Sequence, residues 1–273
     1  MGSIIITRLV LLESQANIRS FKQHQYFCEE KQMIKSVLLW ENQRRYVREA
    51  IDAGELKGAI VPIGSTEQHN EHLAMIHDTA SALHVSKLVA EKLRPQVIVT
   101  TPLAIGVSEH WMDHKGTLTL RPEVFGEVLY DVCDSLRRHG IENVLIINGH
   151  AGNAGPVQQR LEDFRQRLGI NLAFHSYWEA YTSELIAEQM ESGNCPGHAS
   201  EFETAFALAA FPNNVDWENV DYDNAKLTIS NPDRAKNDRA YHHEAKLATA
   251  EKGQVMIDVA VDWVSERMQN MIQ

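Results

Sequence analysis

Short runs of β-branched and aliphatic residues alternate with longer amphipathic stretches from Ser36 onward. This alternation is typical of strands that are joined by helical crossovers in a mostly parallel sheet. We expect strands at residues 58–63, 96–100, 143–147 and 171–175, each short and apolar, as strands covered on both faces are. We expect helices at residues 40–53, 79–93, 122–139, 154–168, 177–190, 200–210, 239–250 and 254–271. The pattern therefore predicts an α/β fold.

The first 32 residues differ from the rest, because they form a mixed polar stretch without a clear period. We expect them to be an N-terminal extension whose role the sequence does not define. No linker rich in glycine, serine or proline divides the remainder, so we expect residues 33–273 to form a single domain.

Charge and cysteine content exclude several classes of partner. A formal net charge of −11 argues against binding to a phosphate backbone. No apolar run approaches the ~20 residues of a membrane-spanning helix, so we expect no membrane partner. The three cysteines, Cys28, Cys133 and Cys195, are widely spaced, which favours a reducing cytoplasm over a disulfide framework.

Two motifs rich in metal-ligand side chains follow the expected strands at 58–63 and 143–147. In the first, Glu67 and His69 are two residues apart, so an extended segment projects them from the same side. Asp78 follows near the start of a helix, where it is a candidate ligand or simply an N-cap. His150 lies in the second motif, and the four side chains together are a nitrogen and oxygen donor set suited to zinc, manganese or iron.

A third segment, residues 196–204, places His198 beside the carboxylates Glu201 and Glu203 at the start of an expected helix. The two carboxylates have a simple alternative role, because negative charge is favourable at a helix N-terminus. His198 is not explained in that way, and we expect it to exchange a proton with substrate. A polar loop, residues 109–115, should reach the same rim, where we expect contacts to substrate from His110, Trp111 and Lys115.

The three motifs resemble those of the creatininase family, and the similarity runs from about residue 33 to residue 210. They are V-P-I-G-S-T-E-Q-H with its following aspartate, I-N-G-H-A-G-N and H-A-S-E-F-E-T. The resemblance implies a three-layer α/β/α fold with a mostly parallel central sheet, a homohexamer and two divalent metals per subunit. It also implies that Glu67, Asp78 and His150 hold one metal while His69 and the bridging Asp78 hold the other. Creatininase has a further glutamate ligand where this chain has Gly152, as in an NGHxGN subgroup, so we expect Glu201 to replace it.

These features predict a metal-dependent hydrolase that directs a metal-activated water at a small cyclic amide or a formamide. A bound metal lowers the pKa of water from 15.7 to about 7. We expect His198 to act as general acid with Glu203 as its orienting partner, and the loop of Gly149, Gly152 and Asn153 to help hold the developing oxyanion.

Two alternatives stay open. One is a ring-opening hydrolase of a cyclic ketone such as a keto-inositol, which would suit the polar loop at 109–115. The other is a metal-binding protein without turnover, for which the loss of a carboxylate at Gly152 is the supporting feature. Creatinine itself is not the expected substrate, because the creatinine enzyme has a tryptophan a few residues before the histidine of the third motif, and residues 191–196 of this chain contain none.

Overall fold

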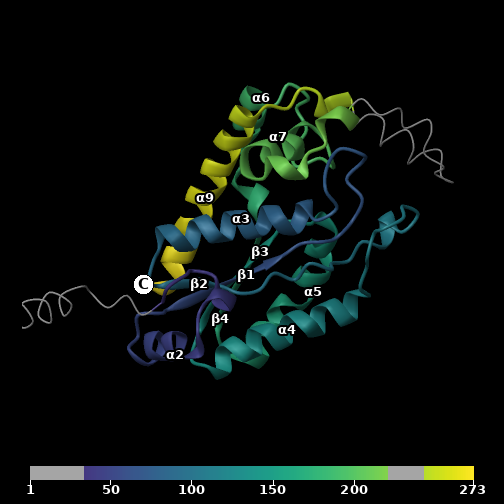
Figure 1. Cartoon of the computed structure of the whole chain (residues 1–273). Coiled ribbons are helices and arrows are strands. Elements are labelled where there is room, and N and C mark those ends of the chain that lie inside the picture. Colours follow the sequence, from purple (N-terminus) through teal and green to yellow (C-terminus); the bar gives the residue numbers. More distant parts are fainter. Residues whose placement is uncertain (1–33, 221–242) are drawn as a thin grey trace, which may run out of the picture. The chain divides into compact units, whose positions relative to one another are not determined.

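The structure, a computed structural model, describes residues 34–220 and 243–273. A four-stranded parallel sheet lies at the centre of this part of the chain (Figure 1). The strand order is β2-β1-β3-β4, and all neighbours are parallel. The strands are β1 (Gly58–Ile63), β2 (Val97–Val99), β3 (Asn143–Asn148) and β4 (Asn171–Ser176). The expected extension at residues 1–32 lies outside the described residues.

Helices cover the two faces of the sheet and make the three-layer α/β/α fold expected from the sequence (Figure 1). Helices α3 and α9 pack on β1 and β3. Helix α5 packs on β3 and β4 from the other face, and α4 packs against α5. The α-helices are α2 (Arg44–Asp52), α3 (His77–Lys92), α4 (Pro122–Arg138), α5 (Ala151–Leu168), α6 (Ser183–Gln189), α7 (Glu201–Ala210) and α9 (Ala250–Ile272). The short 3-10 helices are η1 (Leu39–Glu41), η2 (Glu109–Trp111), η3 (Tyr177–Ala180), η4 (Pro212–Asn214) and η5 (Trp217–Asn219).

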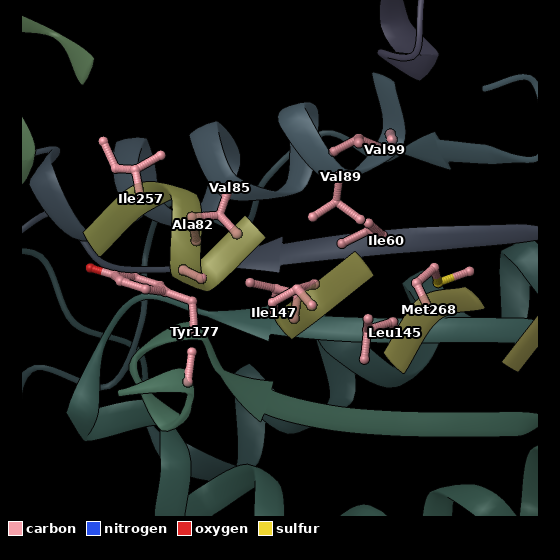
Figure 2. Packing of buried hydrophobic residues seen from close by; sticks show 14 of the residues in the cluster. Ile60, Ala82, Val85, Val89, Val99, Leu145, Ile147, Tyr177, Ile257 and Met268 are labelled. Carbon is pink, nitrogen blue, oxygen red and sulfur yellow. The ribbon is translucent and has the colours of Figure 1, made fainter. Parts of the chain in front are cut away.

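The largest hydrophobic core lies between the sheet and helices α3 and α9. Ile60 of β1 and Leu145 and Ile147 of β3 meet Val85 of α3 and Met268 of α9 in this cluster (Figure 2). All five side chains are fully buried, and each such burial contributes about 1.5–3 kcal/mol. The continuous apolar strands seen in the sequence are therefore explained by cover on both faces.

Two expected helices are interrupted, and in each case polar side chains form hydrogen bonds at the boundaries of the shorter helices. At residues 40–53, η1 ends before α2 because the Asn42 amide donates to the carbonyls of Ser36 and Leu38. At residues 177–190, Ser176 and Glu179 form a capping box for η3, and Thr182 then caps α6 separately. The helix expected at 239–250 lies partly outside the described residues; of the described part, residues 243–245 are helical, and Ala250 is the first residue of α9.

Among the described residues, no helix combines the length and the apolar character that crossing a bilayer requires.

Helices α7 and α9 approach each other at Gly253, where a side chain has no room. A Cβ at this position would overlap the carbonyl oxygen of Ala205 and would lie 2.9 Å from Phe206 N. We expect Gly253→Ala to lower the free energy of unfolding by about 1–3 kcal/mol, although alanine favours a helix by about 1 kcal/mol.

Gly155 is the matched control for Gly253, because it is also a helical glycine and a Cβ there meets no atom within 4 Å. Urea denaturation should show Gly155→Ala to be neutral or stabilising. A Gly253→Ala protein as stable as the wild type would mean that the two helices separate without cost.

Candidate metal centre

The carboxyl ends of the two central strands, β1 and β3, carry the side chains of the site. Ile63 at the end of β1 lies opposite Asn148 at the end of β3, and Gly149 N donates to Ile63 O at 2.8 Å. The chain leaves β1 toward β2 on one side, and it leaves β3 toward β4 on the other. This is a topological switch point, where open parallel sheets bind their ligands.

Asp78 in the first turn of α3 lies between two histidines. Its Oδ1 is 3.0 Å from His69 Nε2, and its Oδ2 is 2.9 Å from His150 Nδ1. Glu67 Oε2 is 3.4 Å from His150 Nε2. The four donors that the sequence predicted therefore meet in one place, and all four are at most 2% exposed.

Glu203 is the fifth donor of this cluster. Its Oε2 lies 3.6 Å from His69 Nε2 and accepts a hydrogen bond from Ala199 N. Ala199 has a φ of 46°, in the left-handed region, so the chain turns sharply between His198 and α7. Candidate ligand atoms of His69, Asp78 and Glu203 all lie within 4.8 Å of one another.

The prediction that Glu201 supplies a metal ligand is wrong. Both Glu201 oxygens are used elsewhere: they accept hydrogen bonds from Glu191 N and Ser192 N, and Oε1 lies 2.6 Å from Lys252 Nζ. Residues two apart on a helix point about 200° apart, so Glu201 faces away when Glu203 faces the cluster.

The cluster fits a divalent cation. Glu67 Oε2, His69 Nε2 and Asp78 Oδ2 are buried and make no hydrogen bond of regular geometry among the described residues, although the histidines and carboxylates lie close to one another. Burial and the charge of Asp78 raise the pKa of Glu67 to about 7, and burial raises the pKa of Glu203 to about 8. Bound cations would offset this crowding of buried carboxylates, and the mixed donors suit zinc, manganese or iron.

The two histidines also have raised pKa values, because the neighbouring carboxylates outweigh the effect of burial. Burial lowers the pKa of His69, but Asp78, Glu203 and Glu67 outweigh it and raise the pKa to about 10. Burial likewise lowers the pKa of His150, yet the hydrogen bond and charge of Asp78 raise it to about 9. The carboxylates of the cluster therefore favour positive charge at this place, which suits a bound cation.

His198 has a neutral ring beside the cluster. Burial lowers its pKa well below the usual histidine value. Its Nε2 lies 2.7 Å from the Gln68 Nε2 amide, and its Nδ1 lies 3.8 Å from Glu67 Oε1. Trp111 stacks on the ring with centroids 4.3 Å apart. Gln68, which the sequence analysis did not consider, is therefore a hydrogen-bond partner of the His198 ring.

A cavity of about 110 Å³ opens onto the cluster. It is lined by four of the donors and His198, together with His110, Trp111, Gly149, Ala151, Trp178, Pro196 and Gly197. Among these, Trp178 was missed by the sequence analysis. It follows the end of β4, and side chains at the carboxyl ends of parallel strands are candidates for ligand binding. His110, Trp111 and Gly149 lie where a substrate contact was expected.

Three other expected substrate contacts lie elsewhere. Lys115 is exposed, and it does not line the cavity. Asn153 is fully buried, and its amide is used internally: it donates to Gly64 O and accepts from Val107 N. Gly152 sits behind His150, packed against Val107 O and the His110 ring.

Comparison with known proteins gives a consistent result. The family model described as Creatininase: Creatinine amidohydrolase matches residues 43–268. The creatinine amidohydrolase of Pseudomonas putida is 26% identical over 256 residues, covering 86% of this chain and 96% of that protein. The 3-dehydro-scyllo-inosose hydrolase of Thermotoga maritima is 25% identical over 173 residues, covering 62% and 54%. A solved structure of a mutant creatininase, of the Zn-Zn type, has a TM-score of 0.74 at 25% identity and covers 88% of this chain and 99% of its own.

Proposed function

This chain belongs to the creatininase family, and from that membership we propose that it is a metal-dependent hydrolase that cleaves the C–N bond of a small cyclic amide or a formamide. The observation that carries the proposal is Asp78, whose two oxygens face His69 and His150 while Glu203 and Glu67 flank them. We assign Glu67, Asp78 and His150 to one cation, and His69, Asp78 and Glu203 to the other. Bound cations of this kind supply an activated water and polarise a carbonyl.

His198 is the residue that we assign to proton transfer. Asn70 N donates to Gln68 Oε1 at 3.0 Å, which fixes the amide so that Gln68 Nε2 faces His198 Nε2. Since the amide nitrogen is a donor, His198 Nε2 must accept, and the proton of the neutral ring is on Nδ1. That proton lies on the side of Glu67, and the ring would take up the proton that the attacking water releases and give one to the leaving nitrogen, so that it ends neutral again.

The cavity walls favour a small and partly planar substrate. Trp111 and Trp178 give it two aromatic walls, and its volume of about 110 Å³ admits only a small molecule. The ring-opening alternative is supported by the relative from Thermotoga maritima and by the polar group of His110 at the rim. The aromatic walls make the amide our first choice.

We propose further that the active form is a cytoplasmic homohexamer with two cations per subunit, and that residues 33–273 are its single hydrolase domain. The two cations are supported by the Zn-Zn type of the similar creatininase structure and by the neighbouring groups of donor side chains. The donor set accepts zinc, manganese and iron alike.

The proposal is tested with protein that has been stripped by a chelator and reloaded with Zn²⁺, Mn²⁺ or Fe²⁺. Cyclic amides such as hydantoins and dihydropyrimidines, N-formyl compounds and hydroxylated cyclic ketones serve as substrates. We expect amide hydrolysis that depends on the cation. Full turnover by verified metal-free protein would contradict the proposal, and ring opening of the ketones alone would establish the alternative.

His198→Ala separates proton transfer from metal binding in the reloaded enzyme. We expect kcat to fall about 10²–10⁴-fold with an unchanged metal content, because the assigned ligands remain. The exposed His139 at the end of α4 gives the control variant, His139→Ala, which should keep both values. A His198→Ala enzyme with normal kcat would remove His198 from the chemistry.

A further inference from the structure

His110 lies at the edge of the cation position formed by Glu67 and His150. Candidate ligand atoms of these three residues all lie within 4.8 Å of one another. The rings of His110 and His150 are parallel within 5°, with centroids 5.7 Å apart. Zinc binds histidine nitrogen at about 2.0–2.1 Å, so two donors of one ion stand at most about 4 Å apart, and the 4.8 Å that bounds this group is close to that limit.

The loop before His110 is built onto the same cluster. Val107 O lies 3.1 Å from His150 Nε2, and Ser108 Oγ lies 3.2 Å from that nitrogen. Asn153 Oδ1 accepts from Val107 N, and Thr119 Oγ1 accepts from Ser108 N, both at 2.9 Å. The backbone that presents His110 is therefore held in place by the residues around the cation position.

Gly152 is what allows the loop to lie there. A Cβ at residue 152 would be 3.0 Å from His110 Cε1, and it would overlap Val107 O and His150 Nε2. Any side chain at 152 would thus displace the loop that carries His110. Because residue 152 has no side chain, the loop can lie close to His150 and place the His110 imidazole beside it.

The donor count leaves room for a further ligand, because three protein groups and a water do not exceed the four or five ligands that a catalytic zinc takes. Glu67 and His150 share Asp78 with the second position, and Glu201, once expected to add a donor, is bonded to Lys252. Resting on the two-cation function proposed above, we propose that His110 is a direct ligand of the cation held by Glu67 and His150. Here an imidazole from the loop occupies the place that a carboxylate from residue 152 would otherwise take.

The test compares His110→Ala with His114→Ala, a histidine of the same loop that belongs to none of the three ligand groups. Full-length protein is loaded with Co²⁺ and titrated with a chromogenic chelator. We expect His110→Ala to weaken one of the two cobalt positions by at least about 10–100-fold, the loss known for residues that only support ligands. His114→Ala should match the wild type.

His110→Cys provides a second readout that does not depend on activity or stability. A thiolate bound to Co²⁺ gives a sulfur-to-metal charge-transfer band, which a cysteine that does not touch the metal cannot produce. We expect this band in His110→Cys and not in His114→Cys. Its absence, together with unchanged cobalt affinity in His110→Ala, would overturn the assignment of His110, whereas a wild-type protein that binds no cobalt would overturn the proposed function itself.

Discussion

Asp78→Asn should abolish the metal centre, with loss of at least one of the two cations and a fall in kcat/KM of about 10³-fold or more. The reason is that Asp78 offers one oxygen to each histidine, so that a single carboxylate serves both cation positions. The asparagine keeps the shape and removes the charge. A loss of several kcal/mol of transition-state stabilisation, the usual contribution of a catalytic metal, corresponds to this change in rate.

Metal analysis and steady-state kinetics check the prediction, with Asp131→Asn on the exposed face of α4 as the control. Two cations per subunit in Asp78→Asn would show that no shared carboxylate is needed. One cation with normal turnover would show that the second position has no role in the reaction.

Lys252→Met should lower the free energy of unfolding by about 3–5 kcal/mol, the usual cost of removing one partner of a buried ion pair. Glu201 is fully buried, and Lys252 Nζ is its only cationic partner among the described residues, at 2.6 Å. Lys252 also binds Glu191 Oε1 and Leu247 O. The variant would leave the Glu201 charge buried without that support.

The matched control is Lys92→Met, which breaks a pair of similar length, 2.7 Å to Asp262, in which both side chains are largely exposed. Exposed pairs contribute about 0–1 kcal/mol. Urea denaturation of the metal-free proteins should separate the two variants clearly. Equal losses would mean that the Glu201 charge is well solvated despite its burial.

The stabilisation by this pair should also depend on pH. Burial raises the pKa of Glu201, but the hydrogen bonds from Lys252 and Ser192 outweigh it, so that the pKa lies below its ordinary value. A lowered carboxyl pKa contributes stability above the pKa of the unfolded chain, about 4.3, and that stability is lost as the pH falls through the folded value. The difference between wild type and Lys252→Met should therefore shrink below about pH 4.

The sequence predicted the strands and four of the donors because both follow local rules. A buried parallel strand reads as an apolar run, as in N-V-L-I-I-N, and ligand side chains follow strand ends. It could not choose between Glu201 and Glu203. Both are acidic residues in the first turn of one helix. The contact with Lys252, which lies 51 residues later in the chain, determines that Glu201 is the one that points away from the metal centre.

The same limit explains the missed roles of Gln68 and Asn153. Gln68 lies between two ligands in sequence, and its contact with His198 spans 130 residues. Asn153 was read as a substrate contact because it follows the histidine loop, but its amide joins the ends of two strands to the Val107 loop. Side chains that connect distant segments carry no local signature.

The donors and the cavity walls come from different kinds of structure, and this has a consequence for how such an enzyme changes over time. Glu67 and His150 stand at the ends of central strands, whereas Trp111, Trp178 and Pro196 come from three separate connections. A connection can lengthen, shorten or exchange residues while the sheet beneath it stays intact. Descendants of one ancestor can therefore inherit the same reactive centre and come to accept different molecules.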